Sequence, residues 1–133
     1  MSSTTQDFEQ GNLYAIEFQQ RPKYLYAFIS GRHDNIENAR KCWLEMLEAC
    51  HKFDYNKLLV EENIEGNISM EEMYKLASEF PAMGFQNILV AFVDLHPSHQ
   101  KLNRFGETVA TSRGGKVRVF DTVVEAKEWI LVN

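Results

Sequence analysis

Short runs of apolar, largely β-branched residues alternate along this chain with longer stretches whose apolar residues recur at helical spacing. After an opening pair of extended runs, a helical stretch and a short apolar run follow each other three times, and a last helical stretch closes the sequence. Crossovers of helical length make successive strands parallel and bring the crossover helices onto one face of the sheet. The pattern therefore predicts a two-layer α/β domain with a mostly parallel sheet and helices mainly on one face.

The first two runs predict an antiparallel hairpin. Residues 13–18 and 23–30 alternate apolar and polar side chains, and Pro22 stands in the short connection. We interpret residues 1–11 as a disordered polar tail and residues 12–133 as one domain. If the strands follow sequence order, the second face of the sheet carries no helix, and hairpin aromatics lie exposed on it: Tyr14, Tyr24, Tyr26 and Phe28. Because monomers avoid such surfaces, we expect a homodimer.

Three more strands and four helices are expected after the hairpin. The strands are predicted at residues 57–60, 88–93 and 116–120, with an acidic loop after the first of them. Asp34 and Glu37 predict the start of the first helix, and Ser69 with Glu72 forms a capping-box pattern before the second, which we expect to end at Pro81. The third helix should stop at two glycines, and the last should be capped at Asp121 or Thr122, with four inward positions: Val124, Ala126, Trp129 and Ile130.

Charge and hydropathy argue against several kinds of partner. The chain has 14 Lys and Arg against 19 Asp and Glu, a net charge of -5, which is the wrong sign for binding nucleic acid through its phosphates. Its longest apolar run has six residues, whereas a membrane-spanning helix needs about 20. The first residues lack the features of a targeting peptide, and Cys42 and Cys50 fall too far apart on one helix for a disulfide. We therefore expect a cytoplasmic protein without a membrane span.

The C-terminal third carries residues that resemble a known family. A helix ending in a Phe-x-Glu-Thr-Val-Ala motif, then Arg-Gly, a Val-Phe strand and a Glu-Ala-x-x-Trp helix are typical of the SpoIIAA-like, STAS-type domains found as short free-standing bacterial proteins. The matching residues here are Phe105, Glu107, Thr108, Val109, Ala110, Arg113, Gly114, Val119, Phe120, Glu125, Ala126 and Trp129. The order of elements agrees with this family over nearly the whole chain.

The resemblance implies a regulatory or binding role. STAS-type proteins act as anti-sigma-factor antagonists switched by serine phosphorylation, or as sensing modules, and relatives of similar topology in the CRAL-TRIO class carry lipids. The switch serine of the family lies in an Asp-Ser-Ser-Gly stretch, and residues 67–70 at the matching place keep one serine, Ser69. Ser69 is thus a candidate for phosphorylation, although an N-cap serine also has a purely structural role.

A candidate ligand site follows from the parallel strands, because open α/β sheets usually bind ligands at the carboxyl ends of their strands. Three predicted loops bring polar residues to that edge: Arg32, His33, Asp34, Glu61, Glu62, Asn63, Asp94, His96, Ser98 and His99. Among them, His96 and His99 could supply two nitrogen ligands to Zn²⁺ or another first-row metal ion, with Asp94 or His33 as a third ligand. Ordinary solvated strand ends are the alternative, and no cofactor is expected.

A second candidate surface is basic. Residues 98–118 hold five basic side chains and one acidic one, whereas residues 57–80 hold six acids and two bases. Lys101, Arg104 and Arg113 are therefore candidates for contact with an anionic head group or an acidic partner. Solvated helix faces would produce the same charge pattern.

Catalysis is not expected from the sequence. The chain has no glycine-rich phosphate loop, no Gly-x-Ser-x-Gly elbow and no cysteine with an evident base. The adjacent acids Glu61 and Glu62 would point to opposite sides of an extended chain. We therefore predict a non-enzymatic regulatory or protein-interaction domain, with a small-molecule or lipid carrier as the alternative. Such a carrier needs an internal apolar cavity of several hundred cubic ångströms, whereas a switch protein should be densely packed and bind through its surface.

Overall fold

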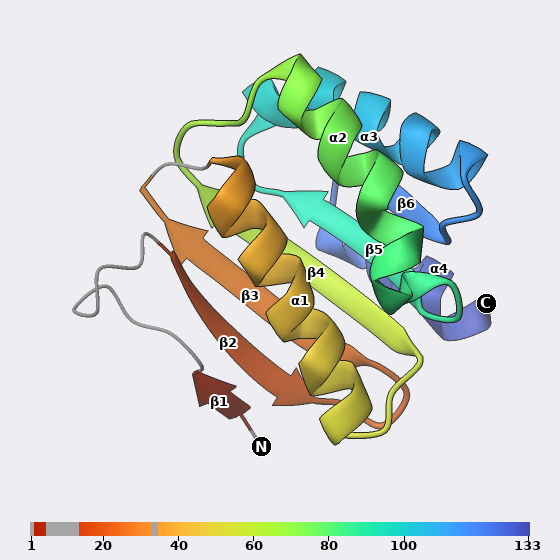
Figure 1. Cartoon of the computed structure of the whole chain (residues 1–133). Helices are drawn as coiled ribbons and strands as arrows, with labels where there is room; N and C mark the ends of the chain where they lie inside the picture. Colours follow the sequence, from red (N-terminus) through yellow and green to blue (C-terminus); the bar gives the residue numbers. More distant parts are fainter. Residues whose placement is uncertain (1, 5–13, 33–34) are drawn as a thin grey trace.

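The computed structural model describes residues 2–4, 14–32 and 35–133. They form a six-stranded sheet in sequence order, drawn in Figure 1. Strands β1 (Ser2–Thr4), β2 (Tyr14–Gln20) and β3 (Leu25–Gly31) are antiparallel neighbours, and β3, β4 (Lys57–Ile64), β5 (Leu89–Asp94) and β6 (Val117–Phe120) are parallel. The predicted α/β architecture with its opening hairpin is confirmed. Strand β1 lies within the predicted tail, whose residues 1 and 5–11 are outside the described residues.

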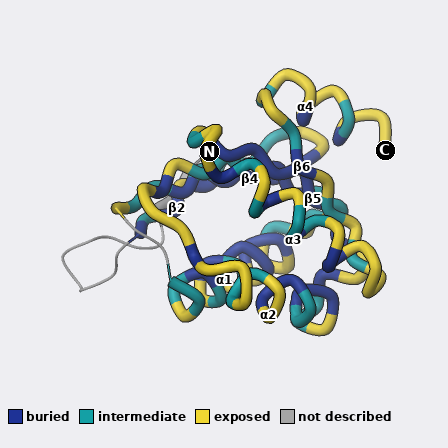
Figure 2. The backbone as a smooth tube through the Cα atoms, turned by 90° about the horizontal axis from the view of Figure 1, so that it is seen from above, coloured by how far each residue is buried: buried dark blue, intermediate teal, exposed yellow. Residues whose placement is uncertain are grey.

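The helices lie on both faces of the sheet, as Figure 2 shows. The crossover helices α1 (Ile36–Lys52), α2 (Met70–Phe80) and α3 (Gln100–Ser112) cover one face, as the right-handed crossover rule predicts. Helix α4 (Val123–Val132) covers part of the other. The expectation that this second face carries no helix is wrong, because α4 follows the edge strand and connects to no further strand, so the crossover rule does not constrain it.

Helix α4 also corrects one detail of the sequence analysis and decides between two alternatives for its cap. Its Ala126 and Ile130 are fully buried against Leu59, Ala91 and Val93 of the sheet. Val124, which was predicted to point inward, is 67% exposed. Thr122 is the N-cap residue, since its hydroxyl accepts the N–H of Glu125 at 3.2 Å.

The main core lies between the three crossover helices and the sheet. Trp43 of α1 stands edge-on to Phe80 and Phe85, with ring centroids 5.3 and 5.7 Å apart, and Phe80 and Phe85 stack at 4.4 Å. Phe92 of β5 completes this aromatic cluster at 6.0 Å from Trp43. Such pairs add about 0.5–1.5 kcal/mol each beyond the area they bury. The cluster holds α1 and α2 against the centre of the sheet.

The start of α1 differs from the prediction, and the end of α2 agrees with it. Asn35 caps α1 by accepting the N–H of Asn38 at 2.9 Å, while the predicted start at Asp34 lies outside the described residues. Helix α2 ends at Phe80 with Pro81 as its C-cap, as predicted. A short π-helical turn, η2 (Pro81–Phe85), follows, because proline is tolerated at the first position of a new turn. That turn needs Gly84, because its φ of 128° is unfavourable for other residues. A Cβ added at this position would also lie 2.9 Å from Leu47 Cδ2.

Strand β4 is longer than its apolar run. The structure continues the strand to Ile64, so Glu61, Glu62 and Asn63 are strand residues and not loop residues. Side chains in a strand alternate between faces. Glu62 therefore points to the side covered by α1, α2 and α3, and Glu61 points to the side covered by α4. This alternation places the Glu62 carboxylate between the sheet and the crossover helices.

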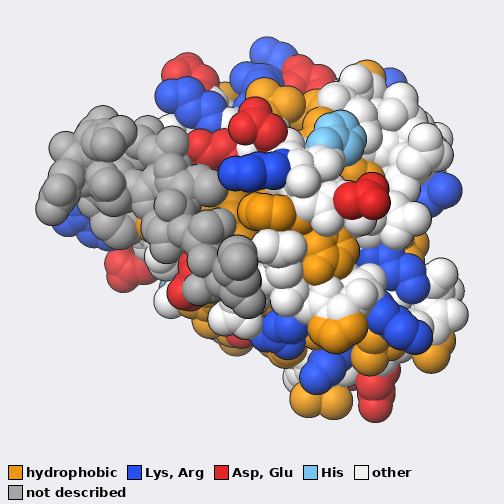
Figure 3. Space-filling model, turned by 90° about the horizontal axis from the view of Figure 1, so that it is seen from below, with side chains coloured by type: hydrophobic (Ala, Val, Ile, Leu, Met, Phe, Trp, Pro, Cys, Tyr) orange, Lys and Arg blue, Asp and Glu red, His pale blue; other side chains and the backbone are white. Residues whose placement is uncertain are grey.

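The described surface mixes both signs of charge. Seen from below the view of Figure 1, basic and acidic side chains are interspersed around hydrophobic ones (Figure 3). Within the residues that the structure describes, no helix has the length and apolar character that a bilayer crossing requires.

Candidate functional site

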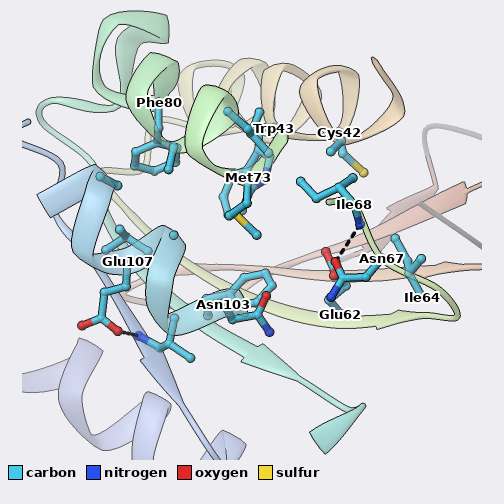
Figure 4. A pocket seen from close by; sticks show the side chains of 18 of the residues that line it. Cys42, Trp43, Glu62, Ile64, Asn67, Ile68, Met73, Phe80, Asn103 and Glu107 are labelled. Carbon is cyan, nitrogen blue, oxygen red and sulfur yellow. Dashed lines mark hydrogen bonds between the residues drawn. The ribbon is translucent and has the colours of Figure 1, made fainter. Parts of the chain in front are cut away.

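A cavity of about 90 Å³ lies between the crossover helices and the sheet. Its apolar wall comes from all three crossover helices and from β5 and β6, as Figure 4 shows in part. The apolar side chains that line it include Trp43, Met73, Leu76, Ala77, Phe80, Phe92, Ala110, Val117 and Val119. Gly106 of α3 also lines it, and a Cβ there would meet the Met73 sulfur at 2.6 Å. The missing side chain lets α2 and α3 approach closely above the cavity.

Polar side chains gather at one end of this cavity. Glu62 and Asn67 lie together beside Ile68 in Figure 4, and Asn103 projects toward them from α3. Tyr14 of β2 and Asn38, in the first turn of α1, line the same cavity. Tyr14, Glu62 and Asn38 all belong to the edge where the parallel strands end and α1 begins. The site is thus amphipathic, with an apolar interior and a hydrogen-bonding mouth.

Tyr14 is held rigidly at this mouth. Its side chain is buried, and its hydroxyl donates a hydrogen bond to Glu45 Oε2 at 3.2 Å. Burial, followed by the nearby Cys42 and Glu45, raises the pKa of Tyr14 above its ordinary value. The hydroxyl therefore stays protonated at neutral pH and acts as a hydrogen-bonding group. Burial likewise raises the pKa of the Cys50 thiol to about 12, which makes Cys50 a core residue and a poor nucleophile.

A buried polar cluster lies next to the cavity at the end of β5. The Asp94 side chain is only 1% exposed and accepts three hydrogen bonds. The donors are the backbone N–H of His96 at 2.8 Å, the His99 ring nitrogen Nδ1 at 3.1 Å and the Asn103 amide at 2.9 Å. Asp94 thus joins β5 to η3 (Pro97–His99) and to α3. Because Asn103 also lines the cavity, this cluster fixes one polar group of the site.

The zinc hypothesis finds little support in this arrangement. The His96 and His99 rings stack with centroids 5.0 Å apart, but His96 Nε2 is hydrogen-bonded to Asn63 at 2.9 Å and His99 Nδ1 to Asp94. Among the residues described, no group of three or more His, Cys, Asp and Glu side chains could hold a metal ion. The proposed ligand His33 lies outside the described residues.

The other residues predicted at the strand ends are dispersed. Glu61 lies on the opposite face, where it accepts a hydrogen bond from the Tyr26 hydroxyl, and burial raises the pKa of that tyrosine. Arg32 and Ser98 are exposed, and Asp34 lies outside the described residues. The structure brings together Asn63, Asp94, His96 and His99 as one hydrogen-bonded group. Glu62 is not part of this group and lines the cavity.

Ser69 has the capping role that its sequence pattern predicts. Its hydroxyl accepts the N–H of Glu72 at 3.1 Å, and the Glu72 carboxylate accepts the N–H of Ser69 at 3.0 Å. A phosphate on Ser69 would place charge beside Glu71 and Glu72 in the first turn. Phosphorylation of Ser69 stays a prediction.

Replacing Ser69 by alanine is expected to lower the free energy of unfolding by about 1 kcal/mol, because the N-cap hydrogen bond is lost. Urea denaturation measures this change. The Ser69→Asp variant keeps a capping oxygen and should stay close to the wild type. Equal stability of Ser69→Ala and the wild type would mean that the capping box contributes nothing.

The basic candidates do not form one patch. Arg104 contacts Asp121 at 3.3 Å, and Arg113, at the other end of α3, donates to the Tyr74 hydroxyl at 3.0 Å. Lys101 is exposed in the first turn of α3. Lys101 and Arg104 lie one turn apart near the start of α3, and the structure separates Arg113 from them.

Several residues of the cavity were missed by sequence reasoning. Asn38 and Asn103 lie at helix positions typical of polar surface, and the helical spacing of Trp43 indicates only a buried position. A signal was present for Asn103, since it belongs to the same α3 face as Gly106 and Ala110, where small and polar residues replace the large apolar ones of a packed face. Helix periodicity alone does not reveal what such a face contacts.

The strand order, the opening hairpin and the three crossover helices define a SpoIIAA-like α/β fold. The chain is similar to a solved structure described as an uncharacterized protein from the DUF3478 family with a SpoIIAA-like fold, from Shewanella loihica PV-4. The two are 14% identical, the match covers 88% of this chain and 93% of that chain, and the TM-score is 0.53. No family model and no curated protein matches the chain. The predicted resemblance is thus confirmed for the fold.

Proposed function

We propose that this protein is a non-enzymatic, cytoplasmic binding domain that takes a small, mainly apolar molecule into the cavity between its crossover helices and its sheet. The observation that carries the proposal is the cavity itself, apolar inside and polar at the edge where the parallel strands end. Ligand sites of α/β proteins commonly occur at this edge and combine an apolar lining with a few polar groups. Burial of both free cysteines supports a reducing compartment.

The size of the cavity favours a small ligand over a lipid. Its volume is about 90 Å³. Pockets for drug-sized ligands begin at about 300 Å³, whereas an engineered apolar cavity of about 150 Å³ binds benzene. The cavity is smaller than both, so it excludes a lipid chain. A single ring is held only in part, against the aromatic side chains Trp43, Phe80 and Phe92, with a short polar arm outside at the open mouth.

Tryptophan fluorescence tests the proposal directly, because the chain has two tryptophans and only Trp43 lines the cavity. In the Trp129→Phe variant, Trp43 is the single reporter, and titration with 2-phenylethanol should give a saturable change in its emission. The Trp43→Phe variant, which keeps Trp129 on the opposite face, should show no such change. A linear response, or the same response in both variants, would contradict binding in the cavity.

A second candidate function is regulation through protein contacts, in line with the resemblance to STAS-type proteins. Helix α2 starts with two exposed apolar side chains, Met70 at 63% and Tyr74 at 48% exposure, directly after Ser69. Exposed apolar residues beside a candidate phosphorylation site support an interaction surface. Affinity capture with the wild type and with the Met70→Glu variant tests this, and a partner retained equally by both would count against the surface.

We also propose a homodimer, on a smaller surface than the sequence suggested. Tyr14 packs on the side of the crossover helices, Tyr24 is buried, and Tyr26 packs at the edge of the cluster under α4, which leaves the half-buried Phe28 and the partly exposed Tyr26 on the second face. Light scattering over a range of concentrations should give the mass of two chains, about twice the 15.5 kDa of one. A constant monomer mass would rule this out.

A further inference from the structure

The charged groups that line the cavity are acidic. Within the described residues, its lining includes the carboxylates of Glu62 and Glu107 and no Lys, Arg or His. Glu107 lies at the end away from the mouth, where its carboxylate accepts the backbone N–H of Val119 at 3.1 Å (Figure 4). Glu62 is therefore the charged side chain that a ligand meets at the polar end.

The position of Glu62 suits contact with a bound molecule. The alternation of β4 turns its half-buried side chain toward the helix layer, and its backbone carbonyl accepts the N–H of Leu95 at 2.8 Å, which holds the strand end in place. The carboxylate has an interaction within the chain. A carboxylate can accept about four hydrogen bonds, so one interaction does not exhaust its capacity.

The donors that line this mouth are uncharged amides, those of Asn38 and Asn67 among them, so an anionic ligand would meet no basic side chain of the described lining. The N-terminus of α1 lies at the same edge, but Asn35 already accepts the N–H of Asn38, and Glu37 occupies the first turn. The N-terminus of α2 is closed by its own capping box. Of the charged residues in 57–80, Glu62 lines the cavity, and its carboxylate favours a cation over a carboxylate at this end.

We propose, as an extension of the proposed function, that the ligand of this cavity is a small amphiphile whose polar end is an ammonium group. Its ring or short alkyl part packs against Trp43, Phe80 and Phe92. Its N–H groups donate to the Glu62 carboxylate, and the neighbouring oxygens of Asn67 and Asn103 are further acceptors at the mouth.

Calorimetric titration of the whole chain with three probes of matched shape tests this selectivity: 2-phenylethylamine, 2-phenylethanol and phenylacetate. At about pH 7 the amine is protonated. The amine should bind about tenfold more tightly than the alcohol, because both can donate a hydrogen bond to Glu62 and only the amine adds a charge of opposite sign, and phenylacetate should bind more weakly than both.

Two variants with the same change in net charge test whether the amine contacts Glu62. Glu62→Gln should weaken the amine about tenfold and leave the alcohol nearly unchanged. Glu61→Gln, one residue away on the opposite face, should leave both affinities unchanged. Binding of the alcohol or phenylacetate at least as tight as the amine would overturn the ammonium assignment while preserving the cavity function. Equal effects of the two variants would overturn the contact with Glu62. Failure of all three probes to bind would count against the proposed function itself.

Discussion

Replacing Asp94 by alanine should lower the free energy of unfolding by about 3 kcal/mol, because a buried carboxylate that accepts three hydrogen bonds is lost. The loss leaves the His99 ring nitrogen Nδ1 and the Asn103 amide without their partner in a buried environment. It also releases η3 and the start of α3 from the end of β5. Chemical denaturation followed by circular dichroism measures this change.

The matched control for this substitution is Asp121→Ala. Asp121 is exposed and contacts Arg104 at the surface, where such pairs contribute about 0–1 kcal/mol. The control should therefore unfold close to the wild type. If Asp94→Ala were as stable as Asp121→Ala, the buried cluster would not hold β5, η3 and α3 together.

Replacing Ala77 by leucine should weaken binding of 2-phenylethylamine by more than about tenfold, because a larger side chain then occupies the apolar interior where the ring would lie. Ala77 lies on α2 and lines the cavity, and its side chain is buried. Overpacking costs about 1–3 kcal/mol, so thermal unfolding must show that the variant is folded. Calorimetric titration gives the affinity.

Ala82→Leu provides the same chemical change on the surface, since Ala82 is exposed in η2. This control should bind the probe as the wild type does. Ala110→Val offers a second way to fill the cavity, from α3 on another wall. Wild-type affinity in both cavity variants would place the ligand elsewhere on the molecule.

The order and direction of the strands were predictable because they depend on the local pattern of apolar residues. Apolar runs separated by helix-length segments specify parallel neighbours, and the Ser69 capping box was visible as a four-residue motif. The face of the sheet on which α4 packs was not predictable in this way. Its exposed Val124 and buried Ala126 and Ile130 follow from where a terminal helix finds uncovered sheet, which is a property of the whole fold.

The candidate site was predictable only in part. The rule for strand ends correctly drew attention to the edge that carries Glu62 and Asp94. The length of β4 decided which side Glu62 faces, and an acidic stretch gives no apolar signal for where a strand ends. The cavity itself arises where α1, α2 and α3 meet over the sheet, so Asn38, Trp43 and Asn103 acquire their common role only through tertiary packing.

Contacts between a bound probe and individual side chains test the central claim most directly. In an isotope-edited nuclear Overhauser experiment, the ring protons of 2-phenylethylamine should show cross-peaks to the methyl groups of Met73, Leu76 and Ala77. The account predicts no cross-peaks to Leu59 or Val93, which pack under α4 on the opposite face. Cross-peaks confined to that face, or none to the three cavity residues at saturating probe, would contradict the cavity as the binding site.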